Sequence, residues 1–178
     1  MKEKWIAKTS KWKAALDVGL NVGLKGGENV LYLGASYGTT VRQIADKTKG
    51  IIFAVEKAER VCGELIKNIK PKKNIAVIFE DAHNIEKIKK RLSKTKIDVL
   101  FQDIPSLDQI GILERASEIV EKDCKILFSL KMKSISKKPV KEVLKDAQKR
   151  LKVKFKILQE ASLERWHKGH WFFVLEKA

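Results

Sequence analysis

Apolar residues along the chain gather in short, nearly continuous runs that are separated by segments of helical periodicity. Seven runs are rich in valine, isoleucine, leucine and phenylalanine, at residues 28–34, 50–56, 74–81, 97–103, 124–130, 154–159 and 170–176. Such runs are typical of strands that are covered on both faces of a parallel sheet. We therefore predict a strand at each run, with the first five parallel to one another.

The segment after each of the first five runs carries apolar residues three and four positions apart, which predicts amphipathic helices. The stripes are Val41, Ile44 and Ala45; Val61, Leu65 and Ile69; Ile85, Ile88 and Leu92; Ile110, Leu113, Ala116, Ile119 and Val120; and Val140, Val143, Leu144, Ala147 and Leu151. Strand–helix alternation of this kind indicates a doubly wound α/β fold. The last two runs leave no room for a helix between them, so we expect a hairpin-like antiparallel pair at the end of the chain.

The length of 178 residues suits one domain with a substantial core. No apolar run approaches the roughly 20 residues that span a bilayer, and the first residues lack the apolar stretch of a signal peptide. We therefore expect a cytoplasmic protein with no membrane partner. Cys62 and Cys124 stand alone and are expected to be small core residues, and no pattern suggests a metal site.

The balance of charge changes the picture of what the protein binds. The chain has 38 basic and 22 acidic residues and a formal net charge of +16. A field of that sign attracts polyanions and speeds their encounter. An anionic partner is the favoured interpretation; a lysine-rich surface adapted to heat is the alternative, although such surfaces usually balance lysine with glutamate.

Small residues follow the first predicted strand, where a doubly wound sheet binds its ligands. They are Gly34, Ala35, Ser36, Gly38, Thr39 and Thr40. Small side chains let the backbone approach a ligand closely, and a helix that starts near Gly38 offers free N–H groups to a carboxylate. A tight turn with good helix packing would explain the same residues.

Carboxylates stand at the ends of the second and third strands. Glu56 can accept hydrogen bonds from two ribose hydroxyls, and Asp81, followed by Ala82, can accept one from the amino group of an adenine ring. Either carboxylate alone could cap a helix instead. Together, behind a glycine turn, they favour a ligand that contains adenosine.

Further strings complete a resemblance that covers nearly the whole chain. The two most specific are Gly-Ala-Ser-x-Gly-Thr-Thr at residues 34–40 and Gln-Asp-x-x-x-x-Asp-Gln at residues 102–109. Ser10–Leu16, Phe53–Glu56, Leu130-Lys131 with Ser134-Ile135, and Gly169-His170 match as well. The chain resembles fibrillarin, the RNA 2′-O-methyltransferase of archaea and eukaryotes.

This resemblance implies a Rossmann-like class I methyltransferase fold over residues 1–178, with a short N-terminal helix, and S-adenosylmethionine as cofactor. It extends the cofactor-binding set to Lys57, Asp103 and Ser106. Lys57 replaces an aromatic residue of the family and Ser106 lies in a stretch that differs from it, as does Tyr37 in the glycine turn. Fibrillarins also carry a small domain ahead of the motif at Lys11, so we expect a short form that lacks it.

The family's catalytic tetrad falls on Lys11, Asp103, Lys131 and His170. A ribose hydroxyl is a poor nucleophile at neutral pH and needs a base. The resemblance implies that Lys131 accepts its proton, Asp103 orients that amine, Lys11 holds the reactive oxygen or a phosphate, and His170 fixes the ribose or a lysine. Taken singly, both lysines could be solvated surface residues and His170 structural. The nearby His167 is expected at the surface.

The resemblance implies a methyltransferase that acts on rRNA or tRNA within a box C/D ribonucleoprotein, with a guide RNA and a Nop-family scaffold protein as partners. Two alternatives stay open. One is a standalone RNA 2′-O-methyltransferase that finds its substrate unaided. The other is a catalytically silent RNA-binding subunit, against which the intact tetrad and the Asp81-Ala82 pair argue.

Overall fold

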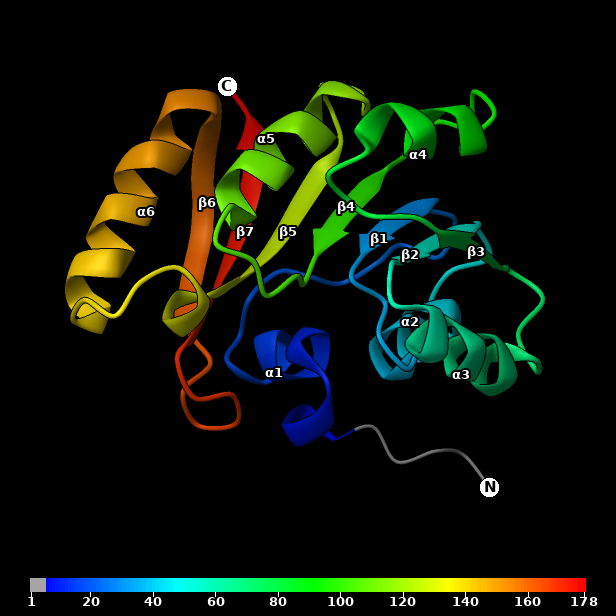
Figure 1. Ribbon diagram of the computed structural model, residues 1–178, viewed down its shortest axis with the longest axis horizontal. Coiled ribbons are helices and arrows are strands. Elements are labelled where there is room, and N and C mark those ends of the chain that lie inside the picture. The colour runs from blue at the N-terminus through cyan, green and yellow to red at the C-terminus, as the bar shows by residue number, and fades with distance from the viewer. Residues whose placement is uncertain (1–5) are drawn as a thin grey trace.

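A seven-stranded sheet runs through the centre of the protein in the computed structural model, which describes residues 6–178 (Figure 1). Its strands are β1 (Val30–Leu33), β2 (Ile52–Glu56), β3 (Ile75–Phe79), β4 (Val99–Gln102), β5 (Lys125–Lys131), β6 (Phe155–Ser162) and β7 (His170–Lys177). The helices are α1 (Lys11–Asp17), α2 (Thr39–Ala45), α3 (Glu59–Ile69), α4 (Ile85–Arg91), α5 (Gln109–Glu118) and α6 (Val140–Lys154). Two 3-10 turns, η1 (Ala7–Thr9) and η2 (Met132–Ser134), precede α1 and follow β5.

The strand order is β3-β2-β1-β4-β5-β7-β6, with β1 to β5 parallel and β7 antiparallel to both of its neighbours. The predicted strands and the terminal antiparallel pair are therefore confirmed. The last strand, β7, lies between β5 and β6, a position that the spacing of the two runs did not indicate. The order reverses between β1 and β4, which opens a crevice at the carboxyl ends of these strands.

Helices cover both faces of the sheet, as the alternation predicted (Figure 1). Within β1, Leu31 and Leu33 join the core under α4, α5 and α6, while Val30 and Tyr32 join the core under α1, α2 and α3. Side chains alternate across a strand, so a strand that is apolar at every position supplies two cores at once. This explains why the central strands read as unbroken apolar runs.

The two cysteines are core residues, as predicted. Cys62 and Cys124 are both buried and unpaired. Burial raises the pKa of the Cys124 thiol to about 12, so it stays protonated and unreactive near neutral pH. Among the described helices, none is both long and apolar enough to cross a membrane.

Candidate active site at the carboxyl edge of the sheet

A cavity of about 300 Å³ lies in the crevice at the ends of β1 to β4. Eight of the predicted cofactor-binding residues line it: Gly34, Ser36, Glu56, Lys57, Asp81, Ala82, Asp103 and Ser106. The sequence interpretation missed other lining residues, namely Val55, Ala58, Val61, Glu80, His83, Ile104 and Pro105. Apolar residues among these supply walls for a flat, apolar group, and the carboxylates supply hydrogen-bond acceptors at its margin.

Gly34 lies where the turn after β1 packs closely against the end of β4. Its φ of +87° is a backbone conformation that residues with a side chain rarely adopt. A Cβ atom at this position would lie 2.9 Å from Cγ1 of Ile104 and closer still to the carbonyl oxygen of Asp103. The turn after β1 can therefore pack against the end of β4 only because residue 34 is glycine.

Glu56 joins the turn after β1 to the loop after β2. One carboxylate oxygen accepts a hydrogen bond from the backbone N–H of Ser36 at 2.9 Å. The other accepts from the N–H groups of Lys57 at 3.0 Å and Ala58 at 2.9 Å. Since Ala58 is the N-cap of α3, Glu56 organises that helix start and also faces the cavity.

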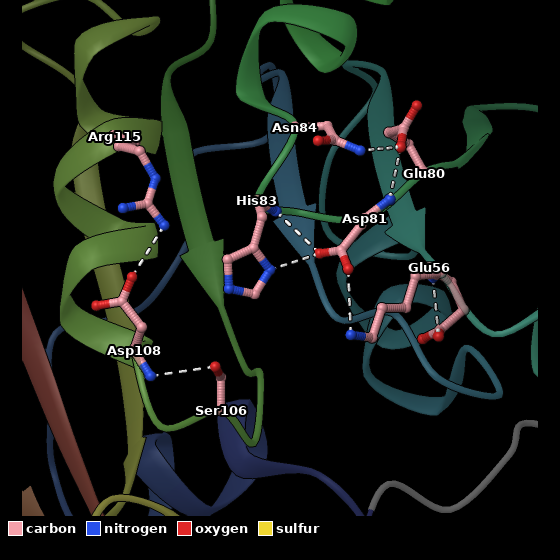
Figure 2. Close-up of polar contacts among 9 residues, drawn as sticks. Glu56, Glu80, Asp81, His83, Asn84, Ser106, Asp108 and Arg115 are labelled. Carbon is pink, nitrogen blue, oxygen red and sulfur yellow. Dashed lines mark hydrogen bonds and ion pairs between the residues drawn. The ribbon is translucent and has the colours of Figure 1, made fainter.

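Asp81 is held in its charged form at the end of β3. Its carboxylate contacts Lys57 Nζ at 3.2 Å, and it accepts hydrogen bonds from the N–H of His83 at 3.0 Å and from the ring Nδ1 at 2.7 Å. Figure 2 shows Asp81 and His83 pointing toward one another. Burial opposes ionisation, but the bonds from His83 and Lys57 outweigh it and lower the pKa of Asp81 to about 2.

His83 follows Asp81-Ala82 directly at the same edge of the sheet, so its position along the chain could have revealed it. It lies in the loop between β3 and α4, and the sequence interpretation assigned it no role. Ser106, another residue of the cavity lining, accepts a hydrogen bond from the N–H of Asp108 at 3.2 Å (Figure 2).

The other predicted cofactor residues lie in the turn after β1 and at the start of α2. Within residues 6–178, Ala35, Gly38, Thr39 and Thr40 lie outside the cavity lining. Gly38 has a φ of +85° at the N-cap of α2 and faces Leu65 of α3. Thr40 is buried, and its hydroxyl donates to Oγ of Ser10 at 3.2 Å. Direct contact of these four residues with the cofactor stays a prediction.

Lys11 reaches Asp103 from the first position of α1. Ser10 caps this helix by accepting a hydrogen bond from the N–H of Lys13. Lys11 Nζ lies 3.0 Å from the carboxylate of Asp103, and their side chains are 26% and 14% exposed. In the described part of the chain no ion pair joins Asp103 to Lys131, so the carboxylate orients Lys11 here.

Lys131 ends β5 and lies opposite His170 in the β5–β7 register. The buried side chain of Gln109 fixes its backbone, donating to the carbonyl of Lys131 at 3.0 Å and accepting from its N–H at 2.9 Å. The same amide also donates to the carbonyl of Ser106 at 2.9 Å. One side chain therefore ties the loop that lines the cavity to the end of β5.

The two histidines of the last loop lie against α1 and its preceding turn. His170 is buried, with Nδ1 3.1 Å from the carbonyl oxygen of Lys168. The expectation that His167 is a surface residue is wrong. Its ring is half-buried, Nε2 donates to the carbonyl of Ala7 at 2.8 Å, and its centroid lies 5.8 Å from that of His170. Residues 160 positions apart make this contact, which no local pattern reveals.

These histidines predict how stability depends on pH. Burial, followed for His170 by the nearby charge of Lys11, lowers the pKa of both His167 and His170 below 6.5. Their contribution to stability is therefore complete above about pH 6.5 and is lost as the pH falls through the lowered values. We expect a lower Tm, followed by circular dichroism, at about pH 5.5 than at about pH 7.5. The Tm of a His167→Gln/His170→Gln variant should fall less between these two pH values. An equal fall would contradict the assignment of the pH dependence to these histidines.

The structure brings the four predicted catalytic residues to one place beside the cavity. Lys11 and Asp103 form an ion pair, Asp103 also lines the cavity, and Lys131 and His170 are neighbours across β5 and β7. Both Lys11 and Asp103 act electrostatically on His170. Cations, a carboxylate and an uncharged imidazole at this edge of the sheet can bind an anionic substrate and move a proton. The described residues form no group of three or more ligands for a metal ion.

Comparisons with known proteins match nearly the whole chain. A family model described as Fibrillarin matches residues 3–178. The chain is similar to the fibrillarin-like rRNA/tRNA 2′-O-methyltransferase of Archaeoglobus fulgidus, with 34% identity over 95% of this chain and 81% of the relative.

Two solved structures are similar as well. A chain of a fibrillarin/Nop5p complex has a TM-score of 0.92 and 31% identity, over 98% of this chain and 84% of that one. Aeropyrum pernix fibrillarin with natively bound S-adenosyl-L-methionine has a TM-score of 0.85 and 30% identity, over 95% and 75%. The predicted Rossmann-like class I methyltransferase fold is confirmed.

Proposed function

The chain belongs to the fibrillarin family, and from this premise we propose that it transfers a methyl group from S-adenosylmethionine to a ribose 2′-hydroxyl of rRNA or tRNA. The observation that carries the proposal is the meeting of two sets of residues at one edge of the sheet. The cavity lined by Glu56 and Asp81 opens beside the Lys11–Asp103 pair. We further propose that residues 1–178 work as one methyltransferase domain.

The cavity suits S-adenosylmethionine in shape and in donor set. Gly34 lines the cavity without a side chain, so the backbone of this turn can lie close to a ligand. Glu56 is placed to accept from ribose hydroxyls, and the ionised Asp81 from an adenine amino group. Lys57, Ala82 and Ser106 would complete the contacts. When bound, the cofactor supplies an activated methyl group.

The protein's own residues would then hold the acceptor and remove its proton. Lys131, fixed at the backbone by Gln109, is our candidate for the base that accepts the hydroxyl proton. Lys11 would hold the reactive oxygen or an adjacent phosphate while Asp103 orients its amine. His170 would steady the ribose or a lysine. Positioning of this kind supplies much of the rate enhancement in a displacement reaction.

RNA is the partner that the charge favours. The net charge of +16 suits a polyanion, and Lys133, Lys137 and Lys138 follow β5 on the side of the site. Because a relative of known structure was solved as a fibrillarin/Nop5p complex, we propose a Nop-family scaffold and a box C/D guide RNA as partners. We place this activity in the cytoplasm, with no membrane partner.

S-adenosylmethionine is expected to bind the purified protein without added metal, because the proposed contacts are carboxylates, backbone groups and apolar walls. Isothermal titration calorimetry in the presence of a chelator measures this. Asp81→Ala should weaken binding by roughly tenfold, the worth of one charged hydrogen bond. Binding that occurs only with a nicotinamide dinucleotide would overturn the cofactor assignment.

The dependence on a guide is tested by methylating total RNA in two reactions. One contains the protein alone; the other adds a box C/D guide RNA and a Nop-family scaffold protein. We expect methyl incorporation only in the second, at the nucleotide that the guide pairs with. Incorporation by the protein alone would favour a standalone enzyme, and none in either reaction, with RNA still bound, would favour a silent subunit.

A further inference from the structure

The two edges of the sheet are protected very differently. The edge strand β6 carries charged residues, among them Lys156 and Glu160, and its pairing with β7 is interrupted by a bulge between Ile157 and Gln159. Natural proteins use both devices to prevent an edge from pairing with another chain. The other edge strand, β3, reads Ile-Ala-Val-Ile-Phe, with no charge or proline inside it and with an uninterrupted register along β2.

The backbone of β3 presents free hydrogen-bonding groups at this edge. The carbonyl of Asn74 accepts a hydrogen bond from the N–H of Ile52, and the N–H of Glu80 donates to the carbonyl of Glu56. The even-numbered positions of β3 therefore face β2. Successive residues of a strand point their N–H and C=O groups in opposite directions. The groups of Ile75, Val77 and Phe79 therefore point away from β2, and β3 ends the strand order of the described chain.

A groove of about 610 Å³ runs along this open edge. Val77 and Phe79 supply its apolar part, and the side chain of Phe79 is 60% exposed. Three cations of α4, Lys87, Lys90 and Arg91, form the other wall. Their spacing of three and four residues puts them on one face of that helix. Glu80 also lines the groove and pairs with Lys87 at 3.6 Å, which leaves a surplus of two positive charges.

We propose that β3 accepts an extended segment of an acidic partner protein as an additional strand of the sheet. Such a strand would pair with the outward backbone groups of Val77 and Phe79. Its side chains would alternate between the two faces of the sheet, carboxylates toward α4 and apolar residues toward Val77 and Phe79. The segment that fits is therefore one in which acidic and apolar residues alternate.

The charges and the open backbone distinguish this partner from others. A second copy of this chain also carries a net charge of +16, so the cations of α4 would repel it. Single-stranded RNA could meet the cations and stack on Phe79, but it has no peptide backbone to pair with the free groups of an edge strand. An acidic peptide can pair with the cations of α4, pack on Val77 and Phe79, and bond to the free backbone groups of β3.

The test uses the full chain, without cofactor or RNA, so it is independent of the proposed methyl transfer. The probe is a fluorescent ten-residue peptide of alternating glutamate and valine, titrated by anisotropy. Amide hydrogen exchange, read by NMR, reports on the backbone. We expect saturable binding below about 1 mM and new protection at the amides of Val77 and Phe79, with no change at Ala76 and Ile78, which already face β2.

Matched charge reversals separate the groove from the general charge of the protein. Lys87→Glu/Lys90→Glu/Arg91→Glu should weaken binding by roughly tenfold or more. Lys145→Glu/Lys149→Glu/Lys152→Glu on α6, with the same change in net charge, should leave it unchanged. Binding without protection at Val77 and Phe79, or no binding, would overturn the proposal. Protection of these amides by oligouridylate and not by the peptide would assign the groove to RNA instead.

Discussion

Replacing Lys131 with alanine is expected to lower the rate of methyl transfer by about 10²–10⁴-fold, the usual cost of losing a positioned base. Affinity for S-adenosylmethionine should stay nearly unchanged, because Lys131 lies outside the lining of the cavity in the described chain. Its backbone is held by Gln109 whatever its side chain, so the variant should keep the local fold. Single-turnover methylation of RNA measures the first effect and calorimetry the second.

Two further variants decide what Lys131 contributes. Lys131→Arg should not rescue the rate, because a guanidinium stays protonated at any workable pH and cannot accept a proton. Lys122→Ala, at an exposed lysine before the amino end of β5 and so far from its carboxyl end, should behave like the wild type. Near wild-type turnover by Lys131→Arg would show that Lys131 supplies charge, and the proton would then leave by another route.

Replacing Gly34 with alanine should be the most damaging single change to the cofactor cavity. The new Cβ would press on the carbonyl of Asp103 and on the side chain of Ile104, both at the end of β4. The positive φ alone costs roughly 1–2 kcal/mol for a residue with a side chain. A displacement of about 1 Å in a positioned group can cost about 10²-fold in rate. We therefore expect a lower Tm, weaker binding of S-adenosylmethionine, and a rate of methyl transfer lower by about 10²-fold.

Gly63→Ala is the matched control for this change. Gly63 lies in α3, and a Cβ there would meet nothing within 4 Å. Alanine should raise stability by about 1 kcal/mol through its better helix propensity and leave cofactor binding unchanged. Unchanged cofactor affinity in Gly34→Ala, with the fold intact by circular dichroism, would mean that the turn after β1 does not form the floor of the ligand site.

Much of the fold could be predicted because its signals are local. Strands buried on both faces read as apolar runs, as β1 and the first three positions of β4 do, and the helices between them carry stripes at regular spacing. The place of β7 between β5 and β6 is a choice of neighbour that apolar runs do not encode. The exposed edge at β3 is hidden in the same way, since its sequence reads like that of a buried strand.

The candidate site was predictable where a residue acts from a strand end. Glu56, Asp81 and Asp103 all line the cavity, because the carboxyl ends of parallel strands meet at one edge. Thr39 and Thr40 stand in the same string but lie outside the cavity lining of the described chain, and their contact with the cofactor stays a prediction. The pairing of Lys11 with Asp103 and the contact of His167 with Ala7 join distant parts of the chain, so only the structure supplies them.

The central claim, transfer of a methyl group to a ribose 2′-hydroxyl, is tested most directly by the chemical identity of the product. RNA is incubated with the protein, guide RNA, scaffold protein and S-adenosylmethionine that carries a trideuterated methyl group, and is then digested to nucleosides for mass spectrometry. We predict trideuterated 2′-O-methylnucleosides, with the label on the ribose fragment, and far less of them at the same reaction time with the Lys131→Ala variant. Label on the base fragment, or an unlabelled ribose in RNA that the wild-type protein binds, would contradict the account.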